Sequence, residues 1–490
     1  MTAPSTPANH RARATLPRLA IIGATALLLA TVLLLPTPPP LARNGELIPL
    51  SWQGKAMLGI LLTAIIFWIT EVLPFSITAI LGMLLIPTFG IGSYSDVVRT
   101  GFGDPIITFF IGVLILSVSF TRSGLGNRLS HLLLSFVGTS PRKVIWGFLL
   151  VGTLLSMWIT DMAVAAILLP IGVSILRQAG VKPMESNFGK GLMISCAWGP
   201  LFGGIATPVG CGPNLLTISF LRELADTDIS FLDWMRVGVP ASLLMIPLGW
   251  LIITRMFPPE LNRLTIGKEE EGVSPSEKAP LNREEWWTAT ILLGTILLWI
   301  ASPVLAEMSA NRIDIPMQAI ALGGAVLLFL PGIEVLSWKE AQRDVDWGAI
   351  ILICGGISIG LAVYDTGAAR WLAWLGLGPI VGTPHVLRVF LIVLLVCAMH
   401  LAFSSNTVTG TIVIPLLIVL ANDLGINPWL ICAPAAFASS LAFILVTETP
   451  TNVIPYSAGY FSIKDMVVPG ILMTMAAALC VGLAALLVGF

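Results

Sequence analysis

Two acidic side chains interrupt otherwise uncharged, apolar stretches of this 490-residue chain. Asp161 is the only charged residue between Lys143 and Arg177, and Glu448 lies in the short polar segment that ends at Asn452. An ionised carboxylate at the centre of a bilayer costs roughly 2.5 to 3.5 kcal/mol on insertion scales, so it persists only beside a cation, a proton or a polar partner. We therefore expect each acid to bind a cation or a proton.

Small polar residues cluster in the same apolar stretches, and the clusters come in two pairs. The first pair is Ser156–Met162 and Leu401–Pro415, and the second is Gly203–Asn214 and Thr447–Asn452. The prolines and glycines of the second pair predict unwound backbone rather than continuous helix. Within a bilayer such backbone must be buried in protein or line a cavity. Broken helices of this kind present N–H groups to anions and carbonyl groups to cations such as Na⁺.

The composition nearly excludes a water-soluble fold. Charged residues make up 11% of the chain and hydrophobic residues 56%, with a mean hydropathy of +0.92, whereas soluble domains carry about 25% charged residues. The net charge of −1 offers no basic field for nucleic acid. The six cysteines form no CxxC pair, so we interpret them as small hydrophobic residues. The composition predicts a polytopic protein whose solvent is the lipid bilayer.

Charges divide the chain into two membrane halves. Basic residues within positions 1–18 precede a charge-free run from Leu19 to Ala42, which predicts an uncleaved helix with a cytoplasmic N-terminal tail in the cell (inner) membrane. We expect a first membrane half over 19–254, a hydrophilic linker over 255–285 and a second membrane half over 286–490.

The two halves resemble each other. Phe102–Ser135 is similar to Val345–Leu377, with an offset of 243 residues that relates Gly124 to Gly367. Later landmarks nearly keep this offset: Thr160 aligns with Ser405, and Thr207-Pro208 with Thr449-Pro450. Different charges around the two units favour opposite orientations. We favour re-entrant hairpins over single spans for the apolar runs Pro105–Thr121 and Trp347–Tyr364. The predicted fold is all-α, with two inverted-topology repeats, re-entrant hairpins and broken helices.

The sequence resembles the divalent anion/sodium symporter family of di- and tricarboxylate and sulfate carriers. The resemblance is carried by Ser405-Asn406-Thr407 with Pro415, by Gly203–Asn214, by Ser439–Asn452, and by the units that end in Ser123-Gly124 and Thr366-Gly367. It implies a homodimer in which a transport domain moves like an elevator against a scaffold domain. It also implies secondary active transport of a small divalent or trivalent anion coupled to Na⁺, with H⁺ as an additional coupling ion to be tested and no organic cofactor.

The resemblance also implies a site. The substrate-binding candidates are Thr160, Asp161, Ser405, Asn406, Thr407, Thr207, Thr449 and Pro450. The Na⁺ candidates are Ser156, Thr160, Asp161, Ala206, Asn214, Ser404, Asn406, Glu448 and Asn452.

Each half departs from the family pattern by one acid: Asp161 stands opposite Asn406, and Glu448 opposite Ala206. The hydroxyl of Ser156 has Leu401 as its counterpart. Two hypotheses follow for the acids, which either supply charged ligands to Na⁺ or bind coupling protons in place of one Na⁺. The alternative is that one or both lie in a wet vestibule with no coupling role.

Two other functions fit parts of the sequence. A cation/proton antiporter or an arsenite-type exporter also has inverted repeats and buried acids, although the intact Ser-Asn-Thr signature fits it less well. An intramembrane aspartyl protease would need Tyr364-Asp365 together with the segment Gly101–Asp104. These two acids fall at opposite ends of aligned repeat units and in the reverse order, so we interpret the match as accidental and expect no enzyme.

Overall fold

The architecture is almost entirely helical in the computed structural model, which describes residues 7–43, 46–135, 138–264, 280–309, 315–376 and 383–488. Nine helices in this part of the chain are long and apolar enough to cross a membrane. These helices confirm the prediction of an all-α polytopic membrane protein. Most of the predicted hydrophilic linker, residues 265–279, lies outside the described residues.

The described residues of the first half form eleven helices and a two-stranded ribbon. Their bounds are α1 (Pro7–Leu34), β1 (Leu41–Arg43), β2 (Glu46–Ile48), α2 (Trp52–Thr70), α3 (Phe75–Thr88), α4 (Tyr94–Phe102), α5 (Pro105–Arg122), α6 (Leu125–Ser135), α7 (Pro141–Ser156), α8 (Asp161–Gln178), α9 (Asn187–Gly204), α10 (Gly212–Ala225) and α11 (Phe231–Met256). The second half contains α12 (Arg283–Met308), α13 (Met317–Leu327), α14 (Trp338–Asp344), α15 (Trp347–Asp365), α16 (Ala368–Gly376), α18 (His385–His400), α19 (Asn406–Asp423), α20 (Trp429–Ser440), η2 (Val446–Glu448), α21 (Pro450–Tyr456) and α22 (Ile463–Leu487).

Helix α1 is shorter at its end than the predicted span. It stops at Leu34, before the prolines at positions 36 and 38–40, and Leu41 already belongs to strand β1. Proline cannot donate the backbone hydrogen bonds that would continue the helix. The ammonium group of Lys55 on α2 donates to the carbonyl oxygens of Leu33, at 3.0 Å, and Leu35. This contact fastens the end of α1 to α2.

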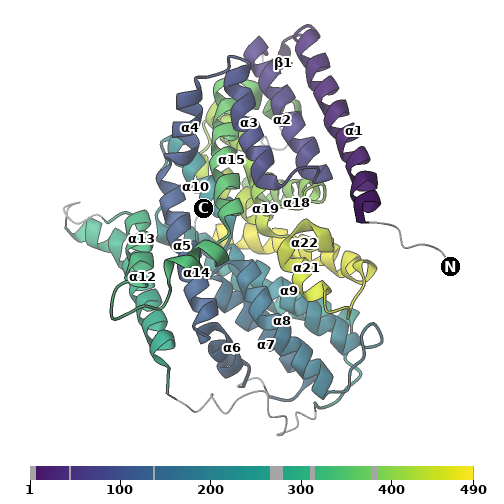
Figure 1. Ribbon diagram of the computed structural model, residues 1–490, viewed down its shortest axis with the longest axis vertical. Coiled ribbons are helices and arrows are strands. Elements are labelled where there is room, and N and C mark those ends of the chain that lie inside the picture. The colour runs from purple at the N-terminus through teal and green to yellow at the C-terminus, as the bar shows by residue number, and fades with distance from the viewer. Residues whose placement is uncertain are drawn as a thin grey trace, which may run out of the picture.

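The two halves repeat the same order of helices and exchange partners with each other. Helices α8 and α19 both have 18 residues, and Gly124 and Gly367 adopt φ angles of +86° and +72°. Helix α3 packs on α15 while α13 packs on α5, and α10 packs on α19 while α21 packs on α8. Helices α3 and α15 lie in the upper part of Figure 1, and helices α13 and α5 lie at its left. Such reciprocal packing is typical of inverted repeats related by a pseudo-two-fold axis.

The predicted hairpins do not lie where we expected them. Pro105–Thr121 lies within the continuous helix α5, and Trp347–Tyr364 lies within α15. Neither helix has a proline beyond its first turn, so nothing in its interior interrupts the backbone hydrogen bonds. The breaks lie between α7 and α8 and between α18 and α19, and each pair of helices is in contact across its break. The polar clusters therefore mark the turns of the helix pairs.

An ion cluster ties the C-terminus of α5 to α14 in the other half. The Arg122 guanidinium donates to Glu340 and Asp344, both at 2.6 Å. Hydrogen bonds from Arg343 and Arg122 lower the pKa of the Asp344 carboxyl to about 2. The carboxylate is thus charged throughout the physiological range, although an exposed pair of this kind contributes little to stability by itself.

Close backbone packing at Gly203 gives a testable result for the fold. A Cβ atom at this position would lie 2.1 Å from the Thr153 carbonyl oxygen of α7. We expect Gly203→Ala to lower the unfolding temperature in detergent, because overpacking costs about 1 to 3 kcal/mol. Gly294→Ala is the matched control, since no atom of the described residues lies within 4 Å of its Cβ position, apart from its neighbours in sequence and the nearby backbone of its own helix. Equal unfolding temperatures for the two variants would contradict the close approach of α7 and α9.

Candidate functional site

Asp161 begins helix α8 directly after the break that follows α7. Its Oδ1 atom accepts the Met162 N–H at 2.8 Å, and its own N–H donates to the Gly210 carbonyl oxygen at 3.3 Å. The residue is 7% exposed, and its Oδ2 atom has no hydrogen-bond partner among the described residues. The side chain of Thr451 approaches this carboxylate from α21. A buried acceptor is thus left open beside the N-terminus of a helix.

Asn406 begins helix α19 in the equivalent place of the second half, after the break Leu401–Ser405. Its Nδ2 atom donates to the Cys211 sulfur at 3.2 Å, and its Oδ1 atom is buried without a partner in the described part of the chain. Thr407 also reaches the first half, since a Cβ atom on Gly212 would lie 2.5 Å from its hydroxyl oxygen. The structure therefore brings the start of α19 onto the start of α10.

Two asparagines fix the unwound segments that follow α9 and α20. The Asn214 amide nitrogen donates to the carbonyl oxygens of Gly204 and Thr207, both at 2.8 Å. The Asn452 amide nitrogen donates to those of Ala442, at 2.8 Å, and Leu445, at 3.1 Å. Both asparagines leave their Oδ1 atom buried and unpartnered within the described structure. In both loops, an asparagine amide that donates to two backbone carbonyl oxygens holds the unwound segment.

This parallel corrects the predicted alignment of the two loops. One offset of 238 residues relates Asn214 to Asn452 and Thr207 to Leu445, so Thr207 is not the counterpart of Thr449. The counterpart of Thr449 is Cys211. Both residues cap the following helix with extended backbone, at φ −152° and ψ 151° for Cys211 and φ −151° and ψ 146° for Thr449.

One further pairing changes with the register of the loops. Glu448 stands opposite Gly210 rather than Ala206, because the offset of 238 also applies to the residue before each cap. The matching Thr-Pro dipeptides had concealed this shift. The pairing of Ser156 with Leu401 keeps its own offset, since each residue lies four positions before the cap of the next helix, Thr160 or Ser405.

The remaining predicted residues are placed as follows. The Thr207 hydroxyl donates to the Met157 carbonyl oxygen at 2.6 Å. This hydrogen bond holds the first break in place, and the hydroxyl proton is therefore not available to a ligand. The Ala206 carbonyl oxygen faces Gly238 of α11, since a Cβ atom there would lie 2.7 Å from it. Thr160 and Ser405 cap α8 and α19 without a side-chain hydrogen bond to the helix.

On the second loop, the Glu448 carboxylate turns back onto its own backbone. It accepts the N–H groups of Leu445 at 2.9 Å and Ile444 at 3.4 Å, and His400 lies beside the Glu448 backbone. Thr449 is buried, whereas Pro450 is exposed at the first position of α21 and Ser404 is half-buried in the second break. Glu448 thus already has two donors that compensate its burial.

Unpartnered buried oxygens are the chemical signature of this region. The side-chain oxygens concerned are Ser156 Oγ, Asp161 Oδ2, Asn214 Oδ1, Asn406 Oδ1 and Asn452 Oδ1. Buried polar atoms in proteins nearly always have a partner, so a group of orphaned acceptors needs an explanation. Oxygen acceptors around unwound backbone suit Na⁺, and the N-termini of α8, α10 and α19 suit an anion.

Sequence reasoning missed three residues near this cluster. Cys211 accepts the Asn406 amide, Ser440 lies beside Cys211, and Thr451 lies beside Asp161. The position of Cys211 inside the polar segment Gly203–Asn214 was the signal that could have identified it. No cluster of three or more His, Cys, Asp or Glu side chains that could hold a metal ion occurs among the described residues.

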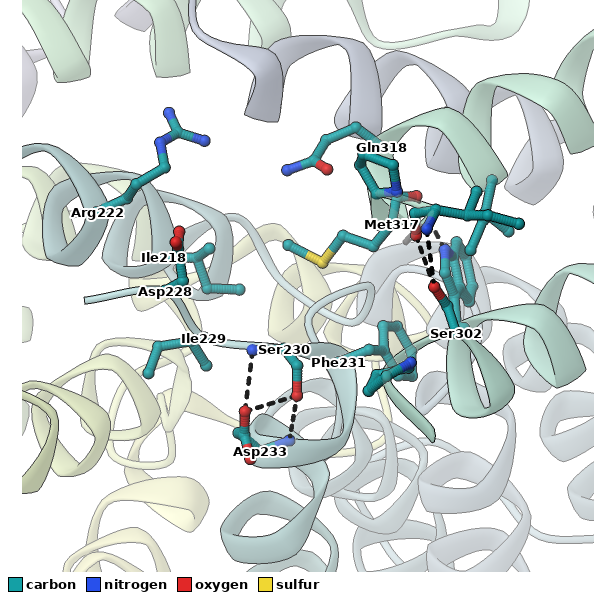
Figure 2. Close-up of a pocket in the computed structure, with 15 residues that line it drawn as sticks. Ile218, Arg222, Asp228, Ile229, Ser230, Phe231, Asp233, Ser302, Met317 and Gln318 are labelled. Carbon is teal, nitrogen blue, oxygen red and sulfur yellow. Dashed lines mark hydrogen bonds between the residues drawn. The ribbon is translucent and has the colours of Figure 1, made fainter. Parts of the chain in front are cut away.

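A separate cavity of about 340 Å³ lies between α10, the start of α11 and the pair α12–α13. Figure 2 shows Arg222, Asp228 and Gln318 along its walls and the capping hydrogen bonds between Ser230 and Asp233 at its floor. The residues that line it include none of the predicted substrate or Na⁺ candidates. This cavity is therefore distinct from the cluster around Asp161 and Asn406.

Of the two acids of the protease interpretation, Asp104 has structural partners. Asp104 caps α5 through the Ile106 N–H at 2.8 Å, accepts the Arg222 guanidinium at 2.8 Å and bonds the Ser219 hydroxyl. Asp365 is the last residue of α15. Asp104 thus acts as a helix cap and ion-pair partner.

The family described as the sodium:sulfate symporter transmembrane region matches residues 18–488. A sodium-dependent dicarboxylate transporter, SdcS, of Staphylococcus saprophyticus is 29% identical over 432 residues, which cover 85% of this chain and 82% of that protein. SdcS of Staphylococcus aureus strain USA300 is 28% identical over 447 residues, with 88% and 85% covered. The relatives are transporters, which confirms the expectation of a transport protein rather than an enzyme.

Two solved structures share the fold. The YdaH transporter of Alcanivorax borkumensis has a TM-score of 0.56 and 16% identity, covering 97% of this chain and 98% of that one. MtrF of Neisseria gonorrhoeae, described among antimetabolite efflux pumps, has a TM-score of 0.53 and 15% identity, with 95% and 94% covered. At these identities the likeness concerns the arrangement of helices alone.

Proposed function

This chain belongs to the sodium:sulfate symporter family, the divalent anion/sodium symporters that its sequence resembles, and we propose that it carries a small dicarboxylate across the cell membrane together with Na⁺. The observation that supports this most directly is that Asn406 of the second repeat donates to Cys211 of the first, while the Asp161 N–H donates to the carbonyl oxygen of the neighbouring Gly210. It places polar groups with free acceptors inside an apolar protein. The names of the staphylococcal relatives make a dicarboxylate the first anion to test.

The two kinds of polar group have complementary roles in this proposal. Backbone N–H groups at the starts of α8, α10 and α19 bind the carboxylates of the substrate, because helix N-termini favour anions. The orphaned oxygens of Ser156, Asp161 and Asn214 bind Na⁺ on the side of the first repeat. Bound Na⁺ offsets both the buried Asp161 charge and the repulsion between this charge and the substrate.

We propose that Asp161 acts as a charged Na⁺ ligand. The neutral side-chain oxygens of Ser156 and Asn214 belong to the same repeat and are also unpartnered, which suits a bound metal ion better than a single bound proton. Glu448 lacks this surrounding, since its carboxylate already accepts two backbone N–H groups. Uptake driven by a proton gradient in the absence of Na⁺ would favour proton binding instead.

The finer organisation is also proposed from the family. Helices α7–α11 and α18–α22 carry the site and form the moving domain of an elevator, while α2–α5 and α12–α15 form the scaffold of a homodimer. The reciprocal packing of α3 on α15 and of α13 on α5 supports a common scaffold. The boundaries 19–254 and 286–490 then divide the chain into its two repeats, with the N-terminus in the cytoplasm.

A ligand-stability measurement tests the proposal directly. We expect succinate in the presence of Na⁺ to raise the unfolding temperature, because a ligand at a hundred times its Kd stabilises the native state by about 2.7 kcal/mol. Replacing Na⁺ by choline is expected to remove the effect. Sulfate, citrate and tartrate, measured under the same conditions, rank the alternatives for the anion.

Uptake into proteoliposomes provides the decisive readout. Accumulation of labelled succinate that requires an inward Na⁺ gradient is the expected result. A protein that ignores all four anions and instead exchanges Na⁺ for protons, or exports arsenite, would show that the antiporter or exporter alternative is correct.

A further inference from the structure

The cavity of about 340 Å³ lies between two groups of helices that the proposed function assigns to different bodies. Arg222 of α10 and the segment 228–233, which leads into α11, belong to its wall on the moving side. Helices α12 and α13 of the scaffold form the opposite wall. Figure 2 shows Arg222 and Asp228 on one side of the open space, and the end of the Gln318 side chain points into it from the other side. A molecule in this cavity would contact both bodies at once.

Both walls of the cavity are largely apolar. The buried side chains of Ile218 and Ile229 line the moving side, and those of Trp299 and Ile320 line the scaffold side. The rings of Phe231 and Trp299 stack where the two walls meet, with 4.8 Å between their centroids. Ligand pockets are typically apolar with a few polar groups that fix the orientation of the ligand. These walls therefore suit a ligand with an apolar body.

Two polar side chains of the cavity are free to bind a ligand. The Ser230 hydroxyl already donates to Asp233 at 2.6 Å, and the Ser302 hydroxyl donates to a backbone carbonyl oxygen at 2.7 Å. By contrast, the Asp228 carboxylate and the Gln318 amide have no hydrogen-bond partner among the described residues. One of these groups comes from each wall.

The free charge of the cavity is negative. Arg222 is the only base among the lining residues, and its guanidinium is shared by the carboxylates of Asp104 at 2.8 Å and Glu223 at 3.0 Å. The second lining acid, Asp233, is paired with an arginine of its own helix at 3.1 Å. The uncompensated charge is therefore that of Asp228, which attracts a cation.

We propose that the cavity binds a primary ammonium group carried on an apolar body, and that the bound molecule slows transport by holding α10 and α11 against α12 and α13. The ammonium group binds the Asp228 carboxylate and the Gln318 side-chain oxygen, while the apolar body lies beside Phe231. A ligand that contacts both walls favours the arrangement in which they are close. The binding site stands by itself, and only its effect on transport rests on the proposed function. Both lipid headgroups and free amphiphilic amines carry such an ammonium group.

Unfolding temperatures of the detergent-solubilised protein test the binding without any transport. The probe is 2-phenylethylamine, which is protonated at pH 7 as aliphatic amines are, and 2-phenylethanol has the same body without the charge. We expect the amine to raise the unfolding temperature in a saturable manner, because a ligand that binds only the native state stabilises it. The alcohol is expected to have no effect at the same concentrations.

Substitution of Asp228 tests the proposed contact. Asp228→Asn is expected to raise the Kd of 2-phenylethylamine about tenfold, because hydrogen bonds between charged groups are the stronger ones. Asp226→Asn is the matched control, since Asp226 is an exposed acid that does not line the cavity. Its φ of +48° is a left-handed conformation that asparagine also adopts, so we expect its Kd to equal that of the wild type. Equal Kd values for the two variants, or no stabilisation of the wild type by the amine, overturn the site.

Uptake into proteoliposomes tests the effect on transport. In vesicles of phosphatidylcholine alone, we expect 2-phenylethylamine to lower the maximal rate of Na⁺-dependent succinate uptake, and excess succinate is expected not to relieve the inhibition. About tenfold more amine is needed for the same inhibition of Asp228→Asn. An amine that stabilises the protein but leaves its uptake unchanged overturns the effect on transport.

The lipid composition identifies the source of the ammonium group. If replacing part of the phosphatidylcholine by phosphatidylethanolamine lowers the maximal rate of the wild type but not that of Asp228→Asn, a lipid headgroup occupies the cavity. Equal rates in the two kinds of vesicle, together with inhibition by 2-phenylethylamine, assign the site to a free amine. No uptake of any tested anion overturns the proposed function, while the unfolding temperatures still decide whether the cavity is a binding site.

Discussion

Asn406→Ala is expected to lower Na⁺-dependent succinate uptake about a hundredfold or more, with the protein still folded. The substitution removes the amide that reaches Cys211 in the other repeat, and with it the unpartnered Oδ1 atom. Loss of the amide and loss of the Oδ1 atom both affect the start of α19. A displacement of about 1 Å in a binding site costs on the order of a hundredfold in rate. Initial uptake rates in proteoliposomes at matched protein density measure the effect.

Asn422→Ala provides the control on the same helix. Asn422 lies near the other end of α19, is exposed, and donates to the Tyr364 hydroxyl at 3.4 Å. We expect its uptake rate to stay close to that of the wild type. If both variants lose uptake to the same degree, the effect comes from a weakened helix α19 and not from the site.

Asp161→Asn is expected to raise the Na⁺ concentration for half-maximal uptake by about 10- to 100-fold, in the range that loss of a metal-site group typically causes. The amide keeps the shape of the side chain and the acceptor for the Met162 N–H, but it removes the negative charge. The cation then loses its only charged ligand in the proposed set. Uptake measured as a function of Na⁺ concentration, at saturating succinate, gives the shift.

Asp104→Asn is the matched control for a buried acid. Asp104 is 6% exposed, much like Asp161, but it is paired with Arg222 at 2.8 Å. Removing one partner of a buried pair leaves the other charge uncompensated. We expect a lower unfolding temperature with an unchanged Na⁺ dependence, which is the opposite of the pattern for Asp161→Asn. An unchanged Na⁺ dependence in Asp161→Asn as well would contradict its role as a Na⁺ ligand.

Local chemistry made several features predictable from the sequence. Charge-free apolar runs identify membrane helices, because a charge in lipid is costly and a helix satisfies its own backbone. The polar clusters around Asp161 and Asn406 likewise predicted breaks, and the structure places an unwound segment before each residue. The offset that relates Gly124 to Gly367 predicted the repeat, and both glycines adopt the left-handed conformation that the turn requires.

The hairpins and the loop register were not predictable in this way. An apolar run such as Pro105–Thr121 has the same composition whether it forms one helix or two, and the structure forms one. The repeated Thr-Pro dipeptide suggested that Thr207 matches Thr449, but a proline is compatible with several positions of an unwound loop. The register is set by which carbonyl groups Asn214 and Asn452 bind, and this is a property of the folded loop.

The sequence by itself determined that this is a membrane protein of two similar halves with acids and broken helices in its interior, because each of these features depends on neighbouring residues and on the bilayer as solvent. Only the tertiary structure decided which residues share the site. Asn406 meets Cys211 across 195 positions of the chain, and it does so because helices of one repeat pack on helices of the other. The pattern of either segment alone does not determine such exchanged packing, so a cysteine that is interpreted from the sequence as a small hydrophobic residue accepts a hydrogen bond from the other repeat.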